Sequence, residues 1–135
     1  MPQGPKKSPP AEPTLQDSAR HALGSLRPLA EKLRRSDPLL ADQLMRAATH
    51  VAAEITNAER APPHGRRPHL LGGLAATCEA MTLLRVAVDS RHCRWDSAKD
   101  TYYELSHTYL ELIKRAATKR RGVAKKPRNG KSRAA

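Results

Sequence analysis

Residues 37–65, DPLLADQLMRAATHVAAEITNAERAPPHG, indicate the fold class of this chain. The stretch opens on Asp37–Pro38, an acid suited to cap a helix followed by proline, which the first helical position tolerates. It closes on two prolines and a glycine, which end a helix. In between, apolar residues recur at spacings of three and four, the period of a helix with one buried face. They are Leu40, Leu44, Ala47, Val51, Ile55 and Ala58.

The same period recurs in three other segments. The first holds Leu15, Ala19, Ala22, Leu26, Leu29 and Leu33. The third holds Leu71, Leu74, Cys78, Met81, Leu84 and Val88, and the fourth Tyr102, Leu105, Tyr109, Leu112 and Ala116. We expect helices over about residues 15–35, 38–60, 69–90 and 97–118. Because the connections are short, consecutive helices should be antiparallel. The sequence therefore predicts an all-α, up-down-up-down antiparallel four-helix bundle over residues 14–118.

Local signals add detail to the predicted helices. Pro28 lies inside the first one, so we expect a kink near Gly24–Ser25 rather than a break. Gly72–Gly73 weakens the third unless a neighbour packs closely against it. Ser97 followed by Asp100 predicts a capping box at the start of the fourth.

The excess positive charge is concentrated at the C-terminal end of the sequence. The chain of 135 residues has 25 Lys and Arg against 13 Asp and Glu, a net charge of +12. Residues 119–135 hold eight of these cations and no acid, and we expect them to form a disordered basic tail. Residues 1–13 hold five prolines and read as a disordered lead. Residues 14–118 then carry a net +3, so most of the excess charge lies on an appendage suited to a polyanion.

Other features narrow the class of protein. We find neither the apolar run of a signal peptide nor a stretch of about 18–20 apolar residues, so we expect a cytoplasmic protein without a membrane partner. Two cysteines, Cys78 and Cys93, do not imply a disulfide framework. Phenylalanine is absent, so the core must be built from aliphatic residues, many of them alanine. Such a core buries little area per residue, which favours an oligomer.

The predicted topology gathers cations at both poles of the bundle. At one pole, Arg60, Arg66 and Arg67 should lie beside the end of the fourth helix. Helix-dipole complementation remains an alternative role for Arg34, Arg35 and Arg60, but not for Arg66 or Arg67, which are expected outside helices. The candidate nucleic-acid-binding residues are Arg66, Arg67, Lys114, Arg115, Lys119, Arg120, Arg121, Lys125, Lys126, Arg128, Lys131 and Arg133. A secondary basic pole consists of Arg34, Arg35, Arg91 and Arg94.

Base contacts have little support in the sequence. The tyrosines fall on or beside the predicted buried stripe of the fourth helix, where packing is the favoured role. Trp95, expected in a loop next to Arg94, is the one aromatic residue kept as a possible base contact.

Enzyme chemistry is not predicted. Glu104 and His107 have the Glu-x-x-His spacing of di-iron bundles, but such sites need a second copy and two further glutamates. No Cys-x₂-Cys spacing supports a zinc set; the candidates are His64, His69, His92 and Cys93. We therefore expect no catalytic residue, no metal and no cofactor.

Short motifs resemble the bacterial four-helix bundle family encoded in 23S ribosomal RNA intervening sequences, most of all its branch of accessory variability proteins from diversity-generating retroelements. They are Leu26-Arg-Pro28-Leu-Ala30, Gln43-Leu-Met-Arg46-Ala-Ala48, Leu83-Leu-Arg85-Val-Ala87 and Glu111-Leu-Ile-Lys114-Arg115, which leads into the basic tail. Glu54-Ile-Thr-Asn57-Ala58 departs from the Asn-Ile-Ala-Glu-Gly of the ribosomal branch. The resemblance implies a homopentamer with a basic surface that associates with a reverse transcriptase and nucleic acid.

Two hypotheses follow. The leading one is a non-catalytic accessory protein that binds RNA and/or DNA through phosphates and assists a reverse transcriptase. The alternative is a protein-interaction bundle of the intervening-sequence type with no direct nucleic-acid role. The preference among RNA, DNA and hybrid, and the faces that join protomers, stay open.

Overall fold

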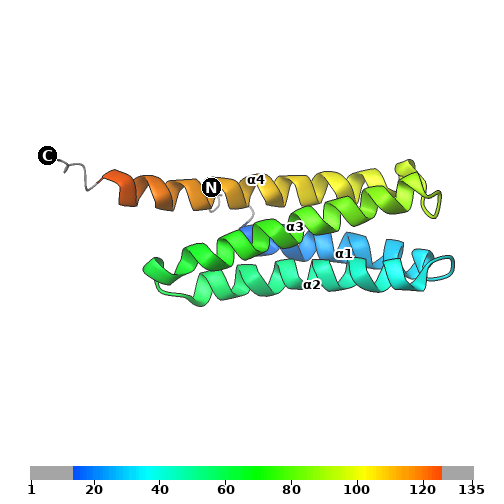
Figure 1. Cartoon of the computed structure of the whole chain (residues 1–135), viewed down its shortest axis with the longest axis horizontal. Coiled ribbons are helices and arrows are strands. Elements are labelled where there is room, and N and C mark those ends of the chain that lie inside the picture. The colour runs from blue at the N-terminus through cyan, green and yellow to red at the C-terminus, as the bar shows by residue number, and fades with distance from the viewer. Residues whose placement is uncertain (1–13, 126–135) are drawn as a thin grey trace, which may run out of the picture.

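The structure is a computed structural model that describes the backbone of residues 14–125 and the side chains of residues 14–117. That part of the chain holds four α-helices, one short 3₁₀ turn and no strand. The helices are α1 (Leu15–Leu33), α2 (Pro38–Arg60), α3 (Arg66–Asp89) and α4 (Trp95–Lys125), and the turn is η1 (Pro63–Gly65). Each helix runs antiparallel to the one before it, as Figure 1 shows. The predicted all-α four-helix bundle is confirmed.

Side-chain caps account for where α1 and α2 begin, and backbone hydrogen bonding marks the start of α4. At α1 the Oγ1 of Thr14 accepts from the Asp17 N–H at 3.0 Å, and the Thr14 N–H donates to Asp17, a capping box that the sequence pattern did not predict. At α2 the predicted cap is confirmed, because Asp37 accepts from the Leu40 N–H at 3.1 Å. At α4 the Ala98 N–H donates to the Arg94 carbonyl, which starts the helix at Trp95. The predicted capping box was therefore wrong, since its first residue lies inside the helix.

The buried faces of α1 and α2 match the predicted stripes. All six residues predicted for each helix are buried, and Leu26, Leu44 and Ile55 are completely inaccessible. Helix α1 continues through Pro28, and both Pro28 and Gly24 are exposed. Water can therefore reach the carbonyl that loses its helical hydrogen bond, which explains why the helix does not break. The predicted kink stays a prediction.

The buried face of α3 differs from the predicted one. Leu71 and Cys78 are exposed, and Leu74, Met81 and Val88 are only partly buried. The face that packs into the bundle is rotated from the predicted stripe and consists mainly of small residues; it holds Leu70, Gly73, Ala76, Thr77, Ala80, Leu84 and Ala87. Periodicity was correct for this helix, but weighting by side-chain size selected the wrong face.

Glycine at position 72 reflects a close approach between α2 and α3. A Cβ atom there would lie 2.8 Å from Oε2 of Glu54. The sequence predicted that glycine would weaken this helix unless a neighbour packed against it, and the Glu54 side chain is that neighbour.

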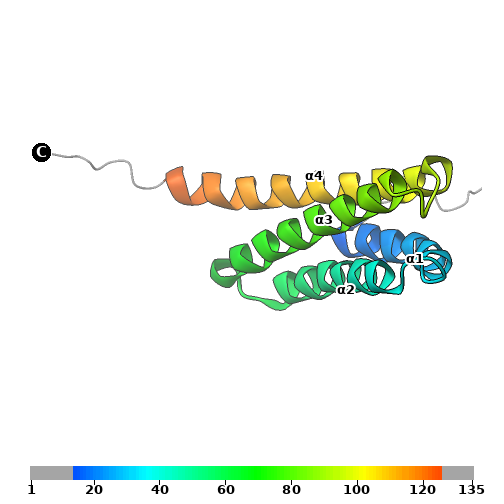
Figure 2. The same ribbon diagram turned by 45° about the vertical axis from the view of Figure 1, so that its right-hand side comes forward.

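Helix α4 buries Leu105, Leu112 and Ala116 as predicted, while Tyr102 and Tyr109 are half-buried. It continues to Lys125, seven residues beyond the predicted end at residue 118. The first part of the predicted disordered tail is therefore helical backbone, and residues 126–135 lie outside the described residues. Figures 1 and 2 show the end of α4 running past the connection between α2 and α3.

One segment is long and apolar enough to cross a membrane by length and composition alone. Pro63–Asp89 contains an 18-residue window of mean hydropathy 1.4, of which 33% is buried. The expectation that no stretch reaches this length was wrong. A core helix passes the same test, and α3 packs against both α2 and α4 in the bundle, so this finding is weak evidence for a membrane.

Candidate nucleic-acid interface

The topology gathers the candidate cations at two ends of the bundle, as predicted. The α2–α3 connection and the end of α4 share one end, and the α1–α2 and α3–α4 connections share the other (Figure 1). We call the first the cationic end. Its described cations are Arg60, Arg66, Arg67, Lys114 and Arg115.

The Arg66 side chain hydrogen-bonds to backbone carbonyls of the same chain. Its Nε donates to the Ala58 carbonyl at 2.9 Å, and its Nη2 donates to the Ala61 carbonyl at 3.1 Å. These carbonyls belong to the last turn and the C-cap of α2, which have no helical partners of their own. The inference that helix capping could not account for Arg66 was wrong, because Arg66 begins α3 and reaches back over the preceding helix.

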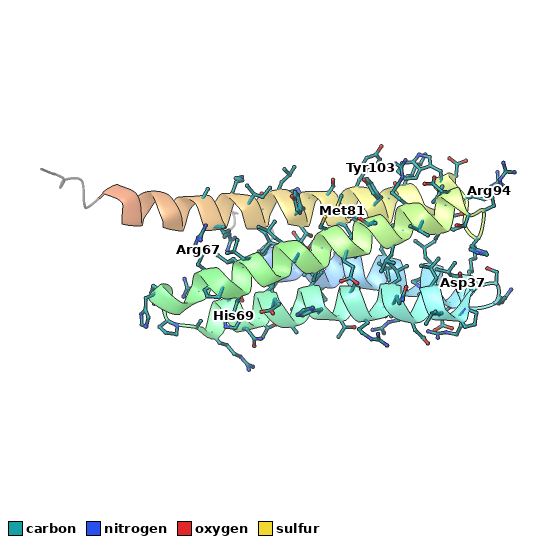
Figure 3. All side chains as sticks on the ribbon, viewed as in Figure 1. Asp37, Arg67, His69, Met81, Arg94 and Tyr103 are labelled. Atoms are coloured by element: carbon teal, nitrogen blue, oxygen red, sulfur yellow. The ribbon has the colours of Figure 1, made fainter. Side chains whose placement is uncertain are left out.

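Arg67 has a buried Nε without a hydrogen-bond partner among the described residues. Figure 3 places Arg67 between the first turn of α3 and the facing part of α4. A buried donor without a partner is costly, so Arg67 is a polar group that the described residues leave unsatisfied at this end.

The cations of α4 form a second group at the same end. Lys114 is exposed and pairs with Glu111 at 3.3 Å, and Arg115 is also exposed. The helix then carries Lys119, Arg120, Arg121 and Lys125, for which the structure describes the backbone only. Lys126, Arg128, Lys131 and Arg133 lie outside the described residues.

At the opposite end, the secondary basic pole is partly neutralised. Arg34 forms an ion pair and hydrogen bond with Asp42, which raises the pKa of Arg34. Arg35, Arg91 and Arg94 are exposed. Arg91 has a φ of 65°, the left-handed region that glycine usually occupies after a helix. Hydrogen bonds from Arg91 N–H to Val88 and from His92 N–H to Ala87 form the Schellman motif that ends α3.

An aromatic cluster at this opposite end joins α3 to α4. Trp95, Tyr102 and Tyr103 pack edge to face, with ring centroids 5.6–6.0 Å apart. The Arg85 guanidinium lies 5.7 Å from the Trp95 ring and 5.9 Å from the Tyr102 ring. Trp95 was expected in a loop, but it is the first residue of α4. Sequence reasoning missed the cluster, although the spacing of seven and eight residues along one helix was a signal for it.

The histidines pair with acids rather than with each other. Glu54 of α2 accepts from His69 of α3 at 2.9 Å and lies 3.2 Å from His50, and the His69 hydrogen bond is the main cause that lowers the pKa of Glu54. Glu104 lies 2.9 Å from His21 of α1, and its other oxygen is buried without a partner among the described side chains.

These pairs do not assemble a metal site. The described residues contain no group of three or more His, Cys, Asp or Glu side chains that could hold a metal ion. The imagined zinc set is split between the two ends of the bundle, since His64 and His69 flank the start of α3 whereas His92 and Cys93 follow its end. Both cysteines are free, and burial raises the pKa of the Cys93 thiol.

Comparison with known proteins identifies the fold. No family model matches the chain, and no curated protein matches it. A crystal structure of a protein of unknown function from the S23 ribosomal protein family, from Bacteroides thetaiotaomicron, is similar with a TM-score of 0.71. The two sequences are 16% identical, and the match covers 76% of this chain and 98% of that one. At this identity the likeness shows a shared bundle fold, and it agrees at that level with the resemblance to the intervening-sequence family.

Proposed function

We propose that this chain is a non-catalytic cytoplasmic accessory protein that binds RNA and/or DNA and assists a reverse transcriptase of a diversity-generating retroelement. The observation that carries the proposal is the length of α4, which leads from the bundle into a run of cations. From Lys114 to Lys125 the helix has six Lys and Arg and no acid. At 1.5 Å per residue these cations span about 18 Å, enough to face several phosphates.

Electrostatics favour a phosphate-binding role for this end over a solubilising one. Cations near a helix C-terminus complement its dipole, but that effect is confined to the last turn and is worth only about 0.3–1 kcal/mol each. Six cations over three turns exceed what one helix end needs.

The test is a comparison of two matched charge-neutralised proteins. One carries glutamine at Lys119, Arg120, Arg121 and Lys125, which keeps good helix formers in place. The other carries glutamine at Arg34, Arg35, Arg91 and Arg94. On duplex DNA, the first set should lower the slope of log affinity against log salt by about 3–4, because each lost phosphate contact removes about 0.9. The second set should lower it less.

The comparison has a clear contrary outcome. If the two proteins keep the same affinity and the same salt slope as the unaltered chain, cations at the end of α4 do not contact nucleic acid, and the proposal is wrong. Circular dichroism of both proteins checks that helicity is unchanged.

We further propose that the chain self-associates through the outer face of α3, with a pentamer as the expected assembly. Leu71, Leu74, Cys78 and Met81 form an apolar stripe there that the single chain does not bury fully. The body of residues 14–118 carries a net charge of only +3, so repulsion between two bodies is weak. Sedimentation should show a smaller assembly for Leu71→Asp than for Leu39→Asp, a matched change at a leucine 68% exposed on α2.

The same stripe favours the alternative function, a protein-interaction bundle. A surface that docks a different protein would tolerate high salt, whereas phosphate binding weakens steeply with it. Salt-insensitive capture of the reverse transcriptase by a protein that binds no oligonucleotide would support the alternative over the leading proposal.

A further inference from the structure

The aromatic cluster at the α3–α4 end has a composition unlike the rest of this surface. Trp95, Tyr102 and Tyr103 are three of the four aromatic residues of the chain, and Tyr102 and Tyr103 lie two turns along α4 from Trp95. A stable core often buries such rings, yet no aromatic residue is fully buried in the described part of this chain.

One ring of the cluster faces outward. Tyr103 is 59% exposed, and Figure 3 shows it on the outer side of α4. Trp95 and Tyr102 are half-buried, with the Arg85 guanidinium over both rings. Arg85 therefore covers one side of the Trp95 and Tyr102 rings, while Tyr103, the most exposed ring of the cluster, can accept a flat ligand.

Charge alone does not make this a phosphate site. The segment from Arg85 to Asp100 contains four cations and three acids, and one acid, Asp96, lies 3.7 Å from Lys99. Attraction for a phosphate chain is weak with so balanced a set. What this end offers, and the cationic end lacks among its described side chains, is aromatic surface on which a base can stack.

We propose that the Trp95–Tyr103 surface stacks an unpaired nucleobase, so that the nucleic acid recognised is single-stranded at this point. This inference rests on the proposed function and narrows its ligand class. A strand held by the cations of α4 would have to extend along the helix to reach Trp95. The helix from Trp95 to Arg115 rises about 30 Å, which a strand of roughly nine nucleotides spans at 3.4 Å each. Duplex bases are already stacked and cannot offer a free face.

The single tryptophan makes a direct test possible. Trp95 is the only tryptophan in the chain, so its fluorescence reports on this site alone. The full chain is titrated with a thymidine oligonucleotide of about twelve residues, an abasic strand of the same length and a duplex. We expect quenching by the thymidine strand, and little change with the abasic strand or the duplex, although both carry phosphates.

A matched pair of variants measures the energetic share of stacking. Tyr103→Leu removes an exposed ring and leaves the core untouched, whereas Tyr109→Leu makes the same change at a half-buried ring outside the cluster. Tyr103→Leu should weaken binding of the thymidine strand about 5- to 150-fold, the range for one stacked base, and leave abasic-strand binding unchanged. Tyr109→Leu should change neither affinity beyond about twofold.

Failure of this inference is distinguishable from failure of the proposed function. If the thymidine and abasic strands bind equally well with no fluorescence change, the chain binds phosphates and the stacking site is refuted. Equal weakening of both strands by Tyr103→Leu also refutes it, because the ring would then act on the fold and not on the base. If none of these strands binds, and an RNA strand of the same length does not bind either, the proposed function itself is wrong.

Discussion

Helices α2 and α3 pack side by side but present their side chains in opposite ways. Helix α2 buries its large aliphatic residues, such as Leu44 and Ile55, and exposes mostly polar ones. Helix α3 buries Gly73, Ala80 and other small residues and leaves Leu71 at the surface. A helix that approaches its neighbours through small side chains packs closely but contributes less buried area. The comparison shows that the large side chains of α2 fill the core, whereas the small side chains of α3 let that helix approach its neighbours closely. The apolar residues on the outer face of α3 remain available to contact another surface.

The largest expected effect comes from truncating one large apolar side chain to alanine on each of the two helices. Ile55→Ala should lower the free energy of unfolding by about 2–5 kcal/mol, because it leaves a cavity at a fully buried position. Leu71→Ala should change it by no more than about 0.5 kcal/mol, because Leu71 is 42% exposed. Urea denaturation of both variants, at a protein concentration where sedimentation shows monomers, measures the contrast. A cost above about 1.5 kcal/mol for Leu71→Ala in the monomer would contradict the observed face of α3.

A glycine pair tests how close α3 lies to α2. Gly24→Ala should stabilise the chain by about 0.5–1 kcal/mol, since a Cβ there meets nothing within 4 Å and alanine is the better helix former. Gly72→Ala should gain little or nothing, because the new Cβ displaces the Glu54 carboxylate from its histidine partners at a cost of about 1 kcal/mol. Thermal denaturation gives both values. Equal stabilisation by the two changes would mean that the helices are farther apart than observed.

The contact between Glu54 and His69 gives the α2–α3 pair a pH dependence. The folded pKa of Glu54 is lower than its ordinary value, mainly because of the hydrogen bond from His69. The stability from this contact is therefore complete above the unfolded pKa of the carboxyl group, and it is lost as pH falls through the lowered folded pKa. Glu54→Gln should remove about 1 kcal/mol at neutral pH and flatten the acid limb of the stability profile. An acid limb that is unchanged by this substitution would assign the dependence to other carboxylates.

The smallest effect concerns reactivity and not stability. Cys78 is exposed on α3, whereas Cys93 is partly buried and burial raises its pKa. A maleimide or disulfide reagent should therefore modify Cys78 of dilute protein at least about tenfold faster, because the thiolate is the reactive form. Protection of Cys78 in concentrated protein, with Cys93 unchanged, would place the α3 stripe inside an assembly. Faster reaction of Cys93 in dilute protein would contradict the exposure of the two thiols.

The sequence predicts the buried face of a helix correctly where the large apolar side chains are also the ones that repeat with the helical period. On α1 and α2 the large apolar residues themselves carry the helical repeat, so the buried face followed from the pattern. On α3 two adjacent stripes share that repeat, and Leu71 weighed more than Gly73 in choosing between them. Only the neighbouring helices decide such a case, because small residues become favourable once another backbone packs against them.

The candidate site was predictable in its location and not in its contacts. Topology placed the cations at two ends, as the short connections required. The role of Arg66 depends on carbonyls that lie five and eight residues earlier in the chain, and no composition rule shows that its side chain folds back to them. The extent of α4 was missed because Gly122 and the dense charge lowered the helix propensity of residues 119–125.

The length of the cationic part of α4 limits how many phosphates of one strand it can contact. Its backbone advances about 1.5 Å per residue, while the phosphates of one strand are about 3.4 Å apart along the axis. The helical stretch from Lys114 to Lys125 is then matched by about five phosphates of that strand, fewer than the six cations it carries. Binding along it should therefore saturate, so that adding a seventh cation within this stretch gains little, whereas lengthening the helix would gain more.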